Sequence, residues 1–187
     1  SWDHPMTTEA VDMVLSSTTG SASYGVLRGT GSPGLLLELL FVLETAGSQS
    51  VYVDRFLPNT PLRFVVDHTG KDVTDAYSAE LMDKRLRIGQ AGALLENETL
   101  QETILPNMIS EATKIAKEIA ARAITNGLQR MNLTLDHEVG RLKAFQKMNQ
   151  HIRHDEIQTA IEEQRLLTMI IKNARIRLDA LQLIQKE

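Results

Sequence analysis

The sequence predicts an α+β fold, in which an antiparallel β-sheet with a short N-terminal helix packs with a long antiparallel two-helix hairpin. Two observations lead to this prediction. Seven of the eight aromatic residues lie before residue 98, where short runs rich in Val, Phe and Tyr are separated by turn residues. After residue 98, apolar residues recur at three- and four-residue spacing, which is typical of amphipathic helices. One domain therefore contains a sheet portion, residues 1–98, and a helical hairpin, residues 99–187.

The chain begins with a predicted helix that Thr7 or Thr8 caps and that runs to about Leu15. Ala22–Arg28 then has the composition of a strand. Leu35–Glu44 is apolar on both of its alternating faces. This pattern favours a strand buried on both sides, although a buried helix fits it as well.

Two further strands are expected at Val51–Leu57 and Leu62–Asp67, because both runs are rich in β-branched and aromatic residues. Asp67–Asp72 follows as a tight turn, in which Gly70 is placed for a positive φ angle. The sheet portion is therefore expected to be built mainly from hairpin-connected, antiparallel strands.

The helical portion has two series of apolar residues, and Pro106 suits the first turn of the first helix. The first series comprises Ile115, Ile119, Ala123, Ile124, Leu128, Met131, Leu135, Val139 and Leu142. A polar link, residues 148–153, separates it from a second series with heptad spacing: Ile157, Ala160, Gln164, Leu167, Ile171, Ala174, Leu178 and Leu181. Residues 178–187 either continue this second helix or form a strand that rejoins the sheet.

Composition excludes several classes of protein. The chain has no cysteine, which removes disulfide frameworks, thiol catalysis and cysteine metal sites and fits the cytoplasm. The longest apolar run, Leu35–Leu43, contains Glu38 and is too short to cross a bilayer. The N-terminus has no signal-peptide pattern and no starting Met, so we expect a piece of a longer protein.

A glycine motif offers one alternative function. Gly29, Gly31 and Gly34 have the G-x-G-x-x-G spacing of dinucleotide-binding loops, and Asp54 lies at a distance that suits a ribose-binding acid. Pro33 argues against this interpretation, because it stands where a helix N-terminus must direct N–H groups at phosphate. A loop between antiparallel strands is the preferred interpretation.

Basic residues near the hairpin tip are the remaining candidate site. Arg141, Lys143, Lys147 and Arg153 could contact a partner or the phosphates of a nucleic acid, although a solvated helix face has the same pattern. A cluster of His and acidic residues at the inter-helix turn does not have the convergent spacing of a metal site. The sequence predicts no catalytic, cofactor-binding or metal-binding residue.

Several short motifs, in order over nearly the whole chain, give it a family resemblance. The motifs are Trp2–Met6, Leu35–Leu39, Arg55–Pro58 with Thr60–Pro61, Ile152–Arg153 with Asp155–Glu156, and Arg177–Leu181 with Leu183–Ile184. With these motifs the chain resembles the C-terminal domain of the RapA family, bacterial RNA polymerase-associated ATPases of the SWI/SNF-like helicase class.

The resemblance implies a larger parent with an ATP-dependent, DNA-binding translocase motor upstream, which would hold ATP and Mg. Such a parent binds RNA polymerase core enzyme and recycles it in transcription. The present chain would then be a non-catalytic accessory or interaction domain, with the motor as its partner in cis. A nucleic-acid contact module of the same parent is the alternative, and exposed sheet edges would favour self-association of the fragment.

Overall fold

The computed structural model describes residues 22–29, 31–46, 52–89, 96–148 and 154–187. The helix expected near Thr7–Leu15 lies outside these residues. The chain forms two compact units. Unit 1 contains the residues up to Val42, Pro61–Lys117 and Arg177–Glu187, and unit 2 contains Leu43–Thr60 and Glu118–Ile176.

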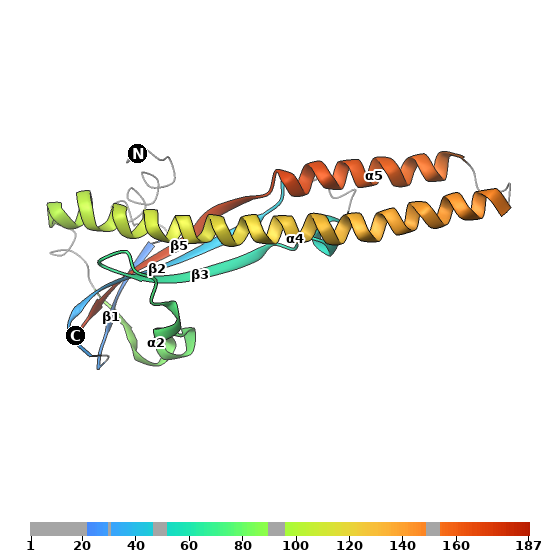
Figure 1. The fold of residues 1–187 in the computed structure, drawn as a ribbon. Helices are drawn as coiled ribbons and strands as arrows, with labels where there is room; N and C mark the ends of the chain where they lie inside the picture. The colour runs from blue at the N-terminus through green and yellow to red at the C-terminus, as the bar shows by residue number, and fades with distance from the viewer. Residues whose placement is uncertain (1–21, 30, 47–51, 90–95, 149–153) are drawn as a thin grey trace. The chain divides into compact units, whose positions relative to one another are not determined.

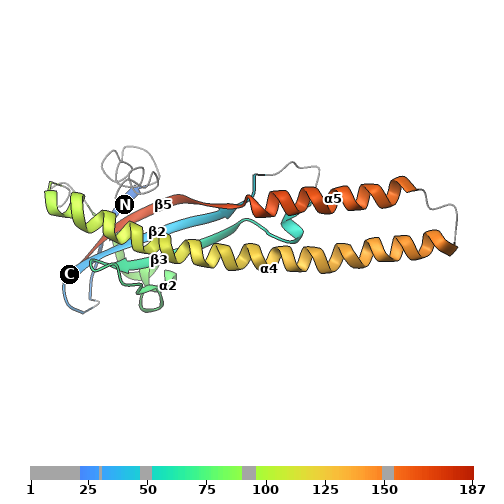
Figure 2. The same cartoon turned by 45° about the horizontal axis from the view of Figure 1, so that its top comes forward.

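The α+β class is confirmed, and the β component is one five-stranded sheet with the order β3-β2-β5-β1-β4. Figure 2 shows β5, β2 and β3 running beside one another. The strands are β1 (Ala22–Leu27), β2 (Gly34–Glu44), β3 (Thr60–Asp67), β4 (Leu86–Ile88) and β5 (Arg175–Lys186).

The sheet is mixed, which corrects the expectation of a purely antiparallel sheet. β1 pairs antiparallel with β4 but parallel with β5, with Ala22 opposite Leu181 and Leu27 opposite Lys186. A parallel pair needs a long crossover connection. Here the whole chain between Leu27 and Arg175 supplies it, and no local pattern in the sequence reveals such a pairing.

β2 is a strand with both faces covered, as one of the two interpretations of Leu35–Glu44 predicted. Leu36 belongs to a buried cluster with Leu27, Val65, Met82 and Ile184, against which Leu81 of helix α2 (Ala79–Arg85) packs. The next side chains along β2 point to the other face and are also fully buried: Leu37, Leu39 and Phe41.

Helix α4 (Leu105–Met148) begins in unit 1. Its first turns bury Leu105, Met108, Ile109, Ala112 and Ala116 completely. Figure 1 shows α2 and these turns on opposite sides of the strands. Unit 1 is therefore a sheet with helices on both faces.

The turn expected at Asp67–Asp72 is confirmed. Gly70 has a φ of 85°, and its N–H donates to the Asp67 carbonyl at 2.9 Å. The Asp67 carboxylate also accepts from the Thr69 backbone N–H at 2.9 Å, the Thr69 hydroxyl at 2.6 Å and the Lys71 N–H at 3.1 Å. Partial burial raises the pKa of Asp67, but these hydrogen bonds and His68 outweigh it, so the pKa lies below its ordinary value.

We expect Asp67→Ala to destabilise the protein by about 1 kcal/mol at neutral pH, since three hydrogen bonds to a partly exposed carboxylate are lost. A lowered pKa means that this stabilisation is present above the ordinary pKa of Asp and disappears as the pH falls through the folded-state pKa. Urea melts at neutral and acid pH measure it. A difference between parent and variant that grows on acidification would contradict the assignment.

The segment between the turn and α4 contains elements that the sequence did not predict. A 3-10 turn (Thr74–Ala76) leads to α2, which Ser78 caps by accepting from the Leu81 N–H, and then to β4. A π-helical turn (Leu100–Ile104) runs directly into α4, so the helix starts before Pro106. Pro106 has no backbone N–H that could donate a hydrogen bond to the preceding turn. The wider π turn lies directly before it.

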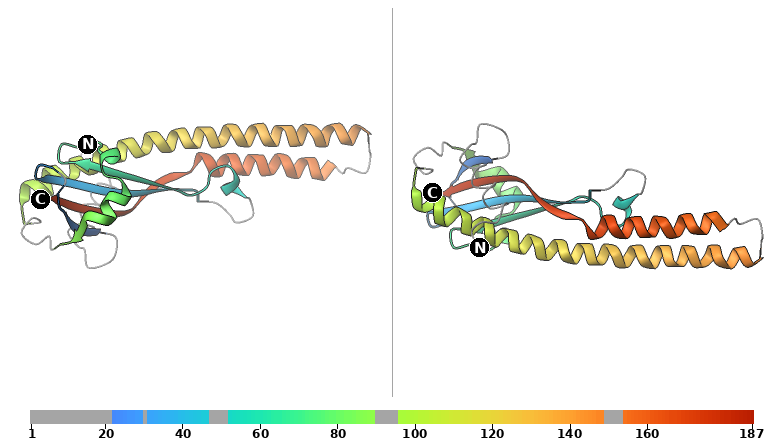
Figure 3. Two further views of the ribbon diagram at one scale, coloured as in Figure 1. Left: turned by 90° about the horizontal axis from the view of Figure 1, so that it is seen from below. Right: turned by 90° about the horizontal axis from the view of Figure 1, so that it is seen from above.

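Unit 2 consists mainly of α4 from Glu118 onward and α5 (His154–Lys172), which we call the helical arm. Both views of Figure 3 show these two helices side by side and antiparallel. Met131 and Leu135 of α4 and Leu167 and Ile171 of α5 share one buried cluster, which confirms the predicted hairpin. The remaining buried members are Leu43, Val53, Phe56, Leu57, Ala120 and Ile170.

Two sequence expectations about unit 2 and its borders are wrong. The run expected as a strand at Val51–Leu57 instead contains a 3-10 turn, Val53–Arg55. Its buried residues Val53, Phe56 and Leu57 are spaced by one helical turn and do not alternate.

The second series of heptad positions ends earlier than expected, because α5 stops at Lys172. Ala174 follows the helix, and Leu178 and Leu181 lie in β5. Charged and apolar residues alternate from Arg175 to Leu178, and this period of two favours a strand. Residues 178–187 therefore take the strand alternative and rejoin the sheet.

Candidate partner-binding surface on the helical arm

The basic residues predicted as a contact site lie on the part of α4 that is farthest along the arm. Arg141, Lys143 and Lys147 are all exposed. None of the three has a salt bridge or hydrogen bond to another described residue. Arg153, the fourth predicted residue, lies outside the described residues. The structure therefore places three of the four basic residues on helix α4.

The local charge is positive because acidic residues are missing from this part of the sequence. Residues 141–153 contain four Lys or Arg and no Asp or Glu, although the whole chain has a net charge of −4. On α5 the situation differs. Arg165 donates to Glu162 at 2.8 Å, and this hydrogen bond lowers the pKa of Glu162. Arg165 of α5 is thus paired locally, whereas Arg141, Lys143 and Lys147 of α4 have no such partner among the described residues.

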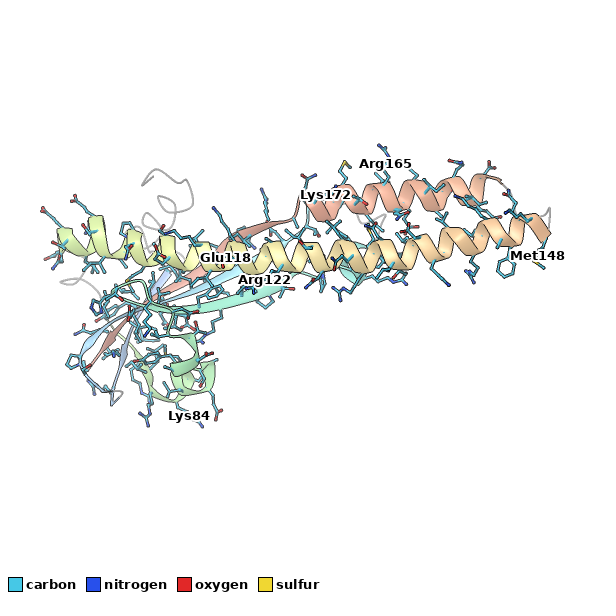
Figure 4. All side chains as sticks on the ribbon, in the orientation of Figure 1. Lys84, Glu118, Arg122, Met148, Arg165 and Lys172 are labelled. Atoms are coloured by element: carbon cyan, nitrogen blue, oxygen red, sulfur yellow. The ribbon has the colours of Figure 1, made fainter. Side chains whose placement is uncertain are left out.

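Large apolar side chains are exposed near these basic residues. Leu133 is 75% exposed, Phe145 is 49% exposed and Met148 is 85% exposed. Figure 4 shows Met148 at the end of α4, on the side away from α5. Sequence reasoning missed these residues, because a Leu or Met in a helix is more often part of a core. The available signal was that these three residues fall outside the predicted first series of apolar residues, which indicates that they do not belong to the buried side of the helix.

Gly140 lies between Leu133 and Met148, and a Cβ atom there would have no neighbour within 4 Å. We expect Gly140→Ala to stabilise the arm by about 1 kcal/mol, because alanine loses less backbone entropy in a helix. The matched control is Gly127→Ala, whose Cβ would lie 3.1 Å from the Phe56 carbonyl oxygen. Thermal melts should show a gain for Gly140→Ala alone; an equal gain for both would contradict the packing at Gly127.

The dinucleotide alternative is contradicted by the structure. Gly34 is the first residue of strand β2, so no helix N-terminus follows Gly29, Gly31 and Gly34. The loop instead joins two strands. Gly29 has a φ of 72° and its N–H donates to the Glu187 carbonyl at 3.1 Å, which ties the loop to the end of β5.

Unit 1 has one large open hollow among the described residues, of about 760 Å³. Its described lining is mostly apolar or uncharged, with His68 and Lys186 as the basic members and no carboxylate. A pair of carboxylates for general acid and base catalysis is therefore not present in this lining. Among the described residues, no group of three or more His, Asp or Glu side chains could share a metal ion.

The described helices include none that is long and apolar enough to cross a membrane. The fold and the surface together define a class: an α+β domain whose two-helix arm carries an exposed surface of basic and apolar residues. The chain belongs to the RNA polymerase recycling family, whose C-terminal model matches residues 1–185.

Curated relatives agree with this assignment. The RNA polymerase-associated protein RapA of Sodalis glossinidius is 30% identical over 186 residues, which cover 98% of this chain and 19% of that protein. RapA of Pectobacterium atrosepticum is 31% identical over 187 residues, with the same coverage. RapA of Haemophilus influenzae is 29% identical over 188 residues, covering 98% of this chain and 20% of that protein. The chain thus spans about a fifth of the length of these relatives.

Proposed function

We propose that this chain is a non-catalytic accessory domain of a longer, cytoplasmic, RNA polymerase-associated ATP-dependent translocase, and that it helps this parent to engage RNA polymerase core enzyme. The observation that carries the proposal is the match of the family's C-terminal model to residues 1–185, among relatives named as RNA polymerase-associated. ATP and Mg belong to the motor in the remaining four fifths of the parent.

The geometry of the arm supports an interaction role. Two helices that share a buried cluster form a stiff element, because packed side chains restrict their movement against each other. Gln164 of α5 donates to Asn132 at 3.3 Å and to Asp136 at 2.8 Å of α4, which fixes the two helices at a second point. A stiff element of this kind holds the residues of a docking surface in fixed positions.

Deleting this region from the parent protein tests the proposal. We expect the deletion variant to hydrolyse ATP at the parent's basal rate and to lose most of its effect on multi-round transcription by RNA polymerase. Loss of basal ATP hydrolysis would instead mean that the region takes part in the catalysis or folding of the motor. Unchanged activity in every polymerase assay would contradict an accessory role in polymerase recycling.

A further inference from the structure

One face of α4 in the arm has exposed apolar residues along a line, with exposed basic residues on both sides of that line. We propose that this face, which we call the outer face and define by Leu133, Gly140, Ala144 and Met148, docks an acidic amphipathic helix of a partner protein. The inference rests on the proposed function, which makes RNA polymerase core enzyme the protein in which to look for that helix.

Helix geometry separates the outer face from the buried side of α4. Met131 and Leu135 share a buried cluster with Leu167 and Ile171 of α5, and Val139, one turn further along α4, is also more than nine-tenths buried. With 3.6 residues per turn, Leu133, Gly140, Ala144 and Met148 project from the opposite side of the helix, and the exposed His137 lies among them. They form a line of about four turns, or roughly 22 Å, which matches the contact length of a docked helix.

The two large apolar side chains on this line are exposed. Leu133 is 75% exposed and Met148 is 85% exposed, and Phe145, which lies beyond Arg141 on one flank of the line, is 49% exposed. A single exposed apolar residue needs no explanation, but apolar residues aligned on one helix face are typical of a surface that another protein covers. Leu133 and Met148 do not belong to the buried cluster that joins α4 to α5.

The centre of the line is flat. Gly140 is exposed and has open space around the position of a Cβ atom, and Ala144 follows it one turn later. Two helices approach most closely where their side chains are small. Leu133 and Met148, on either side of this flat centre, would then contact the ends of a crossing helix. The shape suits a helix better than an irregular loop.

The basic residues on the two sides of the line indicate that the partner helix carries negative charge. Helix geometry places Lys143 and Lys147 on one side of the line and Arg141 on the other. All three are exposed and have no ion-pair partner among the described residues. Acidic residues on both edges of the docked helix would pair with them and favour rapid association. A second copy of this chain fits poorly, because two such faces would bring like charges together.

A nucleic acid also carries negative charge, but it does not account for the apolar residues. Phosphate contacts require Lys and Arg alone, and their strength is independent of Leu133 and Met148. Phe145 could stack on one base, but no second described aromatic side chain lies on α4 to continue a stack. A protein partner accounts for the apolar line and for the basic flanks together.

The test uses the 187-residue chain and purified RNA polymerase core enzyme as the probe, with binding measured at two salt concentrations. Three variants change the outer face in different ways. One reverses its charge (Arg141→Glu, Lys143→Glu and Lys147→Glu), one removes its apolar character (Leu133→Gln and Met148→Gln), and Gly140→Trp blocks it. Matched controls are Lys172→Glu and Met169→Gln on exposed positions of α5. Circular dichroism verifies that every variant keeps its helix content.

We expect each of the three outer-face variants to weaken polymerase binding by about tenfold or more, and the controls to bind like the parent. A photo-reactive amino acid at Ala144 provides a measurement that needs no destabilising change. It should cross-link to an acidic helical segment of one polymerase subunit.

Other outcomes overturn the inference. If polymerase binds the unmodified 187-residue chain and all its variants equally, the outer face is not the docking surface, while the proposed function stands. If polymerase does not bind the unmodified 187-residue chain, the docking surface and the proposed function both fail. If only the charge variant loses binding, and labelled duplex or single-stranded nucleic acid shows the same dependence, the face contacts nucleic acid. If cross-linking at Ala144 joins two copies of this chain, the occupant is a second copy.

Discussion

Replacing Leu167 and Ile171 together by Asp should unfold the helical arm. Leu167 is 1% exposed and Ile171 is fully buried, and both belong to the cluster that joins α5 to Met131 and Leu135 of α4. Removing a buried Leu or Ile side chain down to Ala costs about 2–5 kcal/mol at each position. Asp adds the cost of an unpaired buried charge. The sum is comparable to the whole stability of a domain, about 5–15 kcal/mol.

Far-UV circular dichroism measures the result as a loss of helical signal. The matched control is the replacement of Glu162 and Glu163 by Ala. Glu162 is exposed and, among the described residues, pairs with its neighbour Arg165, so this variant should melt close to the temperature of the unmodified chain. If the double Asp variant melts like the parent while the Glu variant collapses, the buried and exposed sides of α5 are assigned the wrong way round.

The second large effect is expected in unit 1, for Ile184→Asp. Ile184 is fully buried and packs with Leu27, Leu36 and Val65 from three other strands. It lies in β5, which has β2 on one side and β1 on the other. A buried, unpaired carboxylate at the middle strand would separate the two halves of the sheet. We expect unit 1 to lose its cooperative structure. Hydrogen exchange measures this as a loss of protection of the β1 and β2 amides.

Gln185→Ala, at the next residue, is the matched control. Gln185 accepts a hydrogen bond from the Tyr24 hydroxyl at 2.6 Å. Burial, and then the Glu187 carboxylate, raise the pKa of Tyr24, so this hydroxyl remains a donor at neutral pH. Losing one such bond costs about 1 kcal/mol, far less than the Ile184 change. A folded Ile184→Asp variant with protected β1 amides would contradict the placement of β5 in the centre of the sheet.

The sequence allowed the prediction of elements whose signal is local. The arm was predictable because residues such as Leu135 and Leu167 recur at helical spacing, and the turn at Gly70 because its residue types restrict the backbone. β5 was ambiguous, since Leu178 and Leu181 fit the heptad and also fit a strand. The parallel pairing of β1 with β5 was not predictable, because the partners are separated by most of the chain.

The candidate surface was predictable only in part. Arg141, Lys143 and Lys147 were found by charge, and their contact role stays a prediction. Leu133 and Met148 were not found, because exposure depends on which side of α4 faces α5. That side is fixed by the buried cluster that Met131 and Leu135 share with Leu167 of α5. Leu167 lies more than thirty positions further along the chain. Such contacts are tertiary, and no single segment of the sequence specifies them.

The central claim is that this domain binds RNA polymerase, and direct binding of the 187-residue chain to purified core enzyme tests it most directly. A fluorescent label on the chain and a titration with core enzyme give the measurement, with unlabelled full-length parent as competitor. The account predicts saturable binding that the parent displaces and that a chain carrying Leu167→Asp and Ile171→Asp has lost. Absence of binding by the folded chain, or binding that the parent does not displace, would contradict it.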